Sequence, residues 1–334
     1  MPSKDIKMND SLNLQNNLSL SNRSKAFDWR NYIVYIAFLG VIIYFSITLH
    51  DDGFLTTSNL LNIARQTAMI SIMGVAMTFV ISTGEIDLSV GSITALASLT
   101  AALALQAGLG LFGGIAAGLG TGLVIGIING LLITKVAIPS FLVTLGMMGI
   151  VKGLAMWITD TAPVPIVHST FNFLFGSGDI GSIPMLLIWT LIITVIGHIV
   201  LKKTAFGRQT LATGGNEMAA KFTGVKTAKI KFLVFAGSGL MAGFAGMLYA
   251  GRMHAGRYTF GEGDELSVIA AVILGGTSLF GGVGTVIGTV IGSLMIGTIN
   301  NGLIIMGLDV SQQMIVKGLI IILAVAFGRK TLKK

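Results

Sequence analysis

The stretch LFGGIAAGLGTGLVIGIINGLLIT, residues 111–134, contains no charged side chain. A helix of about 20 apolar residues is long enough to cross the hydrocarbon core of a bilayer. Similar runs lie on both sides of it, so the sequence predicts about ten transmembrane helices, several of them barely long enough to cross. The ten runs cover residues 31–49, 67–83, 89–107, 111–134, 138–158, 183–201, 231–250, 266–281, 285–305 and 313–328.

The composition indicates the same class of protein. Hydrophobic residues make up 53% of the chain and charged residues only 11%, whereas soluble domains carry about 25% charged residues. A chain of 334 residues cannot enclose so much apolar surface in a water-soluble core. The 45 glycines fit a membrane protein, because small residues let transmembrane helices approach closely. We therefore expect an all-α integral membrane protein in contact with lipid.

The basic residues predict which segments face the cytoplasm. They cluster at residues 1–30, 202–230 and 329–334, whereas residues 159–182 hold two aspartates and no basic residue. Because cytoplasmic loops carry the excess of Lys and Arg, we expect both termini inside and an even number of spans. Short basic loops beside apolar runs also argue against a nucleic-acid partner. The predicted parts are a disordered cytoplasmic tail (1–30), a transmembrane domain (31–328) with a cytoplasmic loop (202–230), and a basic cytoplasmic C-terminus (329–334).

Three basic residues do not follow this distribution. Arg65, Lys152 and Lys317 fall near predicted outer ends of spans. Long basic side chains on such positions can extend to the membrane interface, which is what we expect of these three.

An internal repeat relates the two halves of the chain. Asp87-Leu88-Ser89-Val90 is followed by a glycine-rich stretch and by Asn129-Gly130, and Glu265-Leu266-Ser267-Val268 is followed by another and by Asn301-Gly302. In the predicted topology the two acidic motifs face opposite sides, as in a transporter with inverted repeats. The alternative is chance similarity in a biased composition.

The segment TGEIDLSVGS, residues 83–92, places two acids next to apolar runs. Each charge costs about 3 kcal/mol at the centre of a bilayer, so Glu85 and Asp87 must face a polar cavity, a partner or the interface. The flanking glycines allow an irregular backbone, which predicts a helix broken near a transport path. The alternative is an interfacial loop whose acids cap the next helix.

The cytoplasmic loop contains a candidate short helix. In GGNEMAAKFTGV, residues 214–225, Asn216 can cap the start of a helix and Gly224 can end it. A short capped helix fits the groove of a partner protein. A solvated loop whose charges only set the topology is the other interpretation.

Residues 260–285 combine acids and repeated glycines around a short apolar run. This pattern predicts helices that half cross the membrane or re-enter it. The glycines are not a nucleotide-binding loop, since the chain has no Walker A pattern. The four histidines are scattered and the chain has no cysteine, so we expect neither a metal site nor a catalytic set.

Several motifs in this order resemble the signature of bacterial ABC sugar-importer permeases of the ribose type, over about residues 33–328. They are MTFV (77–80), GEIDLSVGS (84–92), IPSFLVTLG (138–146), KTAFGR (203–208), GGNE (214–217), DEL (264–266), IAA (269–271), LGGTSL (274–279) and NNGL (300–303). Glu85 stands where many relatives carry glycine, so the resemblance does not specify ribose itself.

The resemblance implies a permease subunit, with residues 31–328 forming the path of a monosaccharide or related small polyol across the bacterial cytoplasmic (inner) membrane. Such permeases work with a second permease subunit in a homo- or heterodimer, a cytoplasmic ABC ATPase and an extracytoplasmic sugar-binding protein. The chain itself is then no enzyme and needs no cofactor, because a partner hydrolyses ATP. The short helix becomes the coupling helix that docks on the ATPase. Its predicted coupling residues are Asn216, Glu217, Ala219, Ala220 and Gly224.

Polar side chains in or beside the spans are the candidates for lining the path. They are Glu85, Asp87, Asn129, Asp264, Glu265, Asn300, Asn301, Gln312 and Gln313. Interhelical hydrogen bonding is the alternative role for the amides. Two other functions stay open: a permease of the same family for branched-chain amino acids or nucleosides, and a stand-alone secondary transporter with a carboxyl group as proton carrier.

Overall fold

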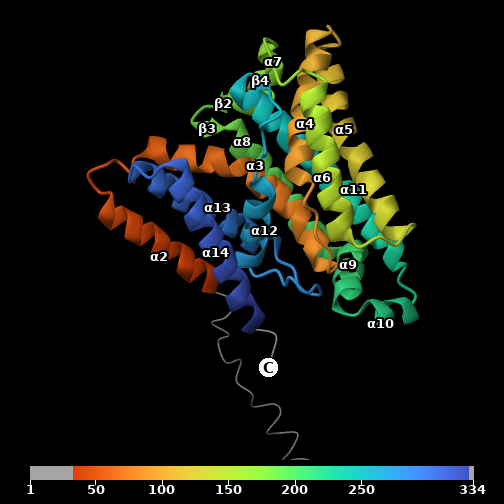
Figure 1. Ribbon diagram of the computed structural model, residues 1–334. Coiled ribbons are helices and arrows are strands. Elements are labelled where there is room, and N and C mark those ends of the chain that lie inside the picture. The colour runs from red at the N-terminus through yellow and green to blue at the C-terminus, as the bar shows by residue number, and fades with distance from the viewer. Residues whose placement is uncertain (1–32, 331–334) are drawn as a thin grey trace, which may run out of the picture.

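The computed structural model describes residues 33–330, without the side chains of residue 321 and residues 323–330. The predicted tail (1–30) and most of the predicted basic C-terminus lie outside the described residues. Helices make up almost all regular structure in the described part (Figure 1), which confirms an all-α protein. Four strands of two residues each form two antiparallel pairs: β1 (Val164–Pro165) with β4 (Ala255–Gly256), and β2 (Asp179–Ile180) with β3 (Ile183–Pro184).

Six helices in the described part are long and apolar enough to cross a membrane. They are α3 (Thr57–Ser82), α5 (Gly110–Thr134), α6 (Ser140–Trp157), α8 (Met185–Lys203), α11 (Thr227–Met253) and α13 (Val286–Ile305). Further apolar helices are α2 (Ile33–Thr48), α4 (Val90–Gln106), α12 (Asp264–Leu274) and α14 (Val310–Lys330). The remaining short helices are α7 (Ser169–Asn172), the π-helix η2 (Phe173–Ser177), α9 (Ala205–Gly215) and α10 (Glu217–Phe222).

Each predicted apolar run contains a helix, but the predicted span over residues 266–281 is wrong. The helix there, α12, has 11 residues and ends at Leu274, where Gly275 and the left-handed Gly276 (φ 91°) turn the chain. At 1.5 Å per residue it is about 16 Å long, roughly half of the hydrocarbon core. Its length agrees with the other expectation for this region, a helix that only half crosses.

The core lies around α3, α4, α11 and α13, most of whose residues are buried, whereas only a minority of the residues of α5, α6 and α8 are buried. A close crossing joins α5 to α11 through glycines on both helices. A Cβ atom on Gly122 would lie 2.2 Å from the carbonyl oxygen of Gly239. Such backbone-to-backbone contact is typical of small-residue crossings in membranes.

The bundle has two distinct ends. One end carries α7 and the four short strands, and the other carries α9, α10 and the loop between α12 and α13 (Figure 1). At the α10 end three segments distant in sequence meet: Gly282 N–H donates to the Ser82 carbonyl at 3.0 Å, and Gly214 lies against both.

Candidate functional site

The segment between α3 and α4 is extended and re-enters the bundle. α3 ends at Ser82 at the α10 end, and residues 84–89 run back inside without helical structure. Ile86 N–H donates to Ser140 Oγ on α6 (3.3 Å), and Thr144 Oγ1 donates to the Ile86 carbonyl (3.4 Å). Neighbouring helices therefore satisfy the backbone that the broken helix leaves free.

Asp87 anchors this re-entrant segment. It is fully buried, and its Oδ1 accepts hydrogen bonds from Ser89 N–H (3.0 Å) and Ser89 Oγ (2.6 Å). Its Oδ2 accepts from Ser238 Oγ on α11 (2.8 Å), and Asn129 Nδ2 on α5 donates to Ser89 Oγ (2.9 Å). Ser89 stands at the N-cap position of α4 but makes no side-chain cap bond. The network joins the start of α4 to α5 and α11.

A second non-helical segment, residues 254–263, consists of β4 followed by turns and approaches from the opposite end. His254 ends α11 in a left-handed conformation (φ 53°), and Arg257 exchanges hydrogen bonds with Ser98 Oγ on α4. The segment then reaches α12, where Tyr249 donates its hydroxyl hydrogen to Asp264 Oδ2 at 2.6 Å.

The start of α4, which follows the first segment, meets the second segment inside the bundle. Gly91, in the first turn of α4, touches Gly261. A Cβ atom on Gly91 would lie 2.3 Å from the Gly261 carbonyl oxygen and 2.5 Å from Glu265 Oε2. Ser238, at the level of Asp87, is eleven residues into α11, about 16 Å from the start of that helix. α4 and α12 thus both begin near mid-bundle, and α12 runs toward the α10 end while α4 runs away from it. The two motifs of the predicted repeat stand at these two starts, and the repeat itself stays a prediction.

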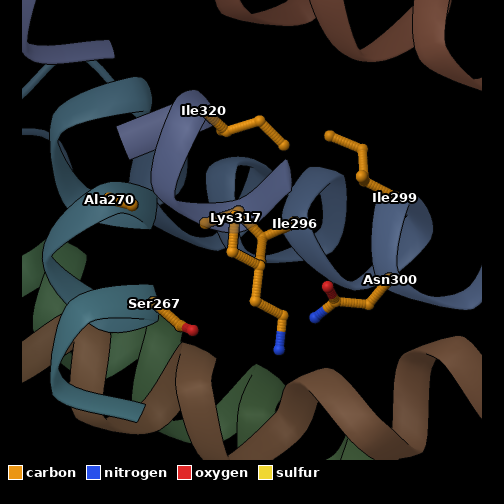
Figure 2. A pocket seen from close by; sticks show the side chains of 7 residues that line it. All are labelled: Ser267, Ala270, Ile296, Ile299, Asn300, Lys317 and Ile320. Atoms are coloured by element: carbon orange, nitrogen blue, oxygen red, sulfur yellow. The ribbon is translucent and has the colours of Figure 1, made fainter. Parts of the chain in front are cut away.

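Charged side chains lie beside this meeting point, and one pair of them is exposed. Lys152 on α6 pairs with Glu262, and the two side chains are 39% and 58% exposed. Lys317 on α14 lies near Asp264. In Figure 2 the Lys317 amine extends between Ser267 of α12 and Asn300 of α13 in a small pocket lined mostly by apolar carbon.

Asn300 is unusual in this pocket. Its buried Oδ1 has no hydrogen-bond partner among the described residues. An unpaired buried amide oxygen is costly and calls for an explanation such as a ligand or water.

The other predicted path residues have structural partners. Asn301 exchanges two hydrogen bonds with Asn59 of α3 (2.8 and 2.9 Å). Gln312 Oε1 accepts from Asp309 N–H and its own N–H donates to Asp309 Oδ1, a reciprocal cap at the start of α14. Gln313 donates to the Leu308 carbonyl. These amides connect elements of the fold.

The predicted short helix exists as α10. Asn216 caps it by accepting from Ala219 N–H at 3.0 Å, and Gly224 follows its end with φ 87°, a conformation that favours glycine. Ala220 is buried, whereas Met218 and Phe222 are 62% and 85% exposed.

Glu217 faces inward from α10 and joins two lysines. Its carboxylate accepts from Lys231 (2.8 Å) and Lys221 (2.9 Å), and the hydrogen bond from Lys231, followed by that from Lys221, lowers the pKa of Glu217 to about 2. Lys231 also pairs with Glu85 at 2.6 Å. The re-entrant segment is thus ion-paired to the base of α10.

Sequence reasoning missed several of these residues. Met218 and Phe222 stood inside the predicted helix, and their i, i+4 spacing could have indicated a shared exposed face. Lys152 was expected at the interface, but it has an acidic partner in Glu262. Ser238 carries no signal that separates it from the many other hydroxyl residues of the spans.

Helices that break inside an apolar bundle, with an exposed ion pair beside the break, define a polytopic membrane transport protein. The chain belongs to the family described as branched-chain amino acid transport system / permease component, whose model matches residues 59–325.

Curated relatives cover most of the chain. The ribose import permease protein RbsC of Bacillus subtilis is 42% identical over 88% of this chain and 92% of its own length, and that of Escherichia coli K12 is 40% identical over 84% and 88%. The L-arabinose ABC transporter permease protein AraH of Azospirillum brasilense is 38% identical over 88% and 86%. No solved structure matches the chain.

Proposed function

We propose that the chain is the transmembrane permease subunit of an ATP-binding-cassette importer that carries a monosaccharide into the cell. The relatives compared above are named as permeases for ribose or L-arabinose, both five-carbon sugars. The branched-chain amino acid wording belongs to the family model as a whole, and relatives at 36–42% identity favour a sugar over an amino acid or nucleoside.

The observation that carries the proposal is the meeting of α4 and α12 at mid-bundle, beside the exposed Lys152–Glu262 ion pair. Two helices that begin there leave irregular backbone at membrane depth, which is tolerated only beside protein or a water-filled path. Lys152 and Glu262 are too exposed to face lipid at a cost of about 3 kcal/mol each. We assign the sugar path to the face formed by α6, residues 262–267 and α14, with a second permease subunit closing it.

Within that path, the pocket in Figure 2 supplies both kinds of hydrogen-bonding group. Asn300 Oδ1 is an unpaired acceptor and the Lys317 ammonium is a donor. The pocket has room for about one water molecule, which both donates and accepts, so a water can link the two groups beside the path.

The α10 end faces the cytoplasm in this proposal, since the basic loop 202–230 lies there. α10 is the coupling helix, and its exposed Met218 and Phe222 enter a groove of the ATPase. Glu217 and Ala220 support the helix from inside, and Asn216 and Gly224 fix its two ends.

A proton-coupled secondary transporter is not favoured. The relatives of this chain are named as permeases of ribose and arabinose transport systems. Asp87, one of the acids considered as a proton carrier, is held by three hydrogen bonds away from any exposed surface.

Reconstitution tests the proposal. The purified permease is placed in proteoliposomes with its ATPase and binding protein, and uptake of labelled ribose, arabinose and leucine is measured with ATP inside. We expect ATP-dependent uptake of a pentose and none of leucine. Uptake by the permease alone, driven by a proton gradient, would refute the proposal in favour of a secondary transporter.

A further inference from the structure

Lys231 links two parts of the chain that the proposed function keeps separate. It lies four residues after the start of α11, and its Nζ is 2.8 Å from Glu217 Oε2 on α10 and 2.6 Å from Glu85 Oε1 on the re-entrant segment. The Lys231 and Glu85 side chains are 15% and 17% exposed. Both ion pairs are therefore partly shielded from water, where charge-assisted hydrogen bonds are stronger than at the surface.

We propose that Lys231 is the positioning residue through which movement of α10 displaces the re-entrant segment 84–89 and, with it, the start of α4. The inference rests on the proposed function, since it assumes that an ATPase pulls on α10. Lys231 is the internal link between α10 and the path, which the proposed function leaves unspecified.

The route on the permease side is short. α10 has six residues and reaches the rest of the chain through α9 and the base of α11, so a pull on α10 loads the Glu217–Lys231 contact. From Lys231 the second ion pair reaches Glu85, two residues before the fully buried Asp87.

Beyond Asp87 the contacts are rigid. Asp87 and Ser89 fix the segment to Ser238 and Asn129, and Gly91 then touches Gly261 at the start of the path. We therefore expect a displacement of Glu85 to move the start of α4 against Gly261, because the contacts between them leave no free space. Close-packed contacts of this kind transmit small shifts because they cannot deform continuously.

A second lysine provides the matched control. Lys221 also pairs with Glu217, at 2.9 Å, but it lies on α10 itself and its side chain is 54% exposed. Lys221→Met removes a Glu217 ion pair without touching the link to the re-entrant segment, whereas Lys231→Met removes the link.

The test uses the complete transporter and a thiol reporter. Because the chain has no cysteine, Leu88→Cys places a single thiol in the re-entrant segment, where Leu88 is half-buried. In the parent we expect the rate of thiol labelling to change about five-fold or more between the nucleotide-free and vanadate-trapped states. Lys231→Met should reduce that change to less than about two-fold and lower sugar uptake per ATP hydrolysed about ten-fold, with Lys221→Met like the parent.

Three further outcomes keep the inference falsifiable. If Lys231→Met preserves both the labelling change and the uptake per ATP, the inference is wrong. Should that variant not fold, Glu85→Gln decides, because it keeps the shape of the side chain and must give the same loss of coupling. A parent that binds no ATPase and takes up no sugar with ATP overturns the proposed function itself, which separates the two failures.

Discussion

The backbones of Gly91 and Gly261 touch where two helices of opposite direction begin. A Cβ atom on Gly261 would lie 2.7 Å from the Gly91 carbonyl oxygen, and Gly261 has φ 72°. No side chain fits on either residue without moving the start of α4 or the turn that contains Gly261. The contact thus sets the distance between the segment that enters from the α10 end and the one that enters from the α7 end.

The first prediction follows from this contact. Gly91→Ala forces a methyl group against backbone, which should destabilise the protein by about 1–3 kcal/mol and abolish sugar uptake. Thermal unfolding in detergent and uptake in proteoliposomes measure the two effects. Gly149→Ala on α6 is the control, because a Cβ there meets nothing within 4 Å. Equal behaviour of the two variants would argue against a tight contact at mid-bundle.

A second pair of glycines tests the crossing of α5 and α11. Gly122→Ala places a methyl group 2.2 Å from the Gly239 carbonyl and should cost about 1–3 kcal/mol by overpacking. Gly120→Ala, two residues away on the same helix, meets open space and should cause no loss, since alanine favours helix by up to about 1 kcal/mol. The thermal unfolding midpoint of each variant in the same detergent checks this prediction, and a stable Gly122→Ala would contradict it.

The lowered pKa of Glu217 predicts a pH dependence. A carboxyl group whose pKa falls on folding stabilises the folded state above its ordinary value of 4.5 and loses that contribution as the pH falls toward about 2. The difference in thermal midpoint between wild type and Glu217→Gln should therefore be constant from about pH 5 to about pH 8 and shrink below pH 4.5. A difference that already disappears near pH 6 would mean that the lysine pairs do not form.

The exposed face of α10 predicts where the ATPase binds. Phe222→Ser removes an 85% exposed aromatic ring from that face and should reduce co-purification of the ATPase about ten-fold or more, with little change in folding. Val167→Ser is the control: it removes an apolar side chain that is 95% exposed at the other end of the bundle. Full ATPase recovery with Phe222→Ser would place the docking surface elsewhere.

Sequence patterns predicted the helices well because lipid imposes a simple rule on length and polarity. The α10 helix was predicted because Asn216 and Gly224 supply local capping chemistry that does not depend on the fold. The span over 266–281 failed for the opposite reason: hydropathy counts apolar residues, whereas Gly275 and Gly276 end the helix through backbone conformation.

The sequence could not predict which residues of the candidate site contact one another, because these contacts join residues far apart in the chain. Asp87 and Asn129 were predicted beside a path, and the structure buries both in hydrogen bonds between elements. The sequence had left that role open for Asn129, whereas its alternative for Asp87 was a cap on the next helix. The ion pairs of Lys231 join residues 146 and 14 positions apart, a relation that only the packed bundle defines. A charged residue inside an apolar run indicated a polar environment. The sequence did not indicate whether that environment was an ion-pair partner or a transport path.

The last prediction separates the sugar path from ordinary surface charge. Two exposed ion pairs between distant elements can be compared: Lys152–Glu262 beside the meeting point, and Arg65–Asp179, with side chains 33% and 43% exposed, joining α3 to β2. Exposed pairs contribute about 0–1 kcal/mol, so neither Lys152→Gln nor Arg65→Gln should change stability measurably. Uptake should nevertheless fall about ten-fold in Lys152→Gln, because the charge that orients Glu262 toward the path is lost, and stay within about two-fold of wild type in Arg65→Gln. Uptake assays with both variants at matched ATPase content measure this. If Arg65→Gln is the defective variant and Lys152→Gln is normal, the path lies along α3, and the face of α6, residues 262–267 and α14 is a lipid or subunit contact.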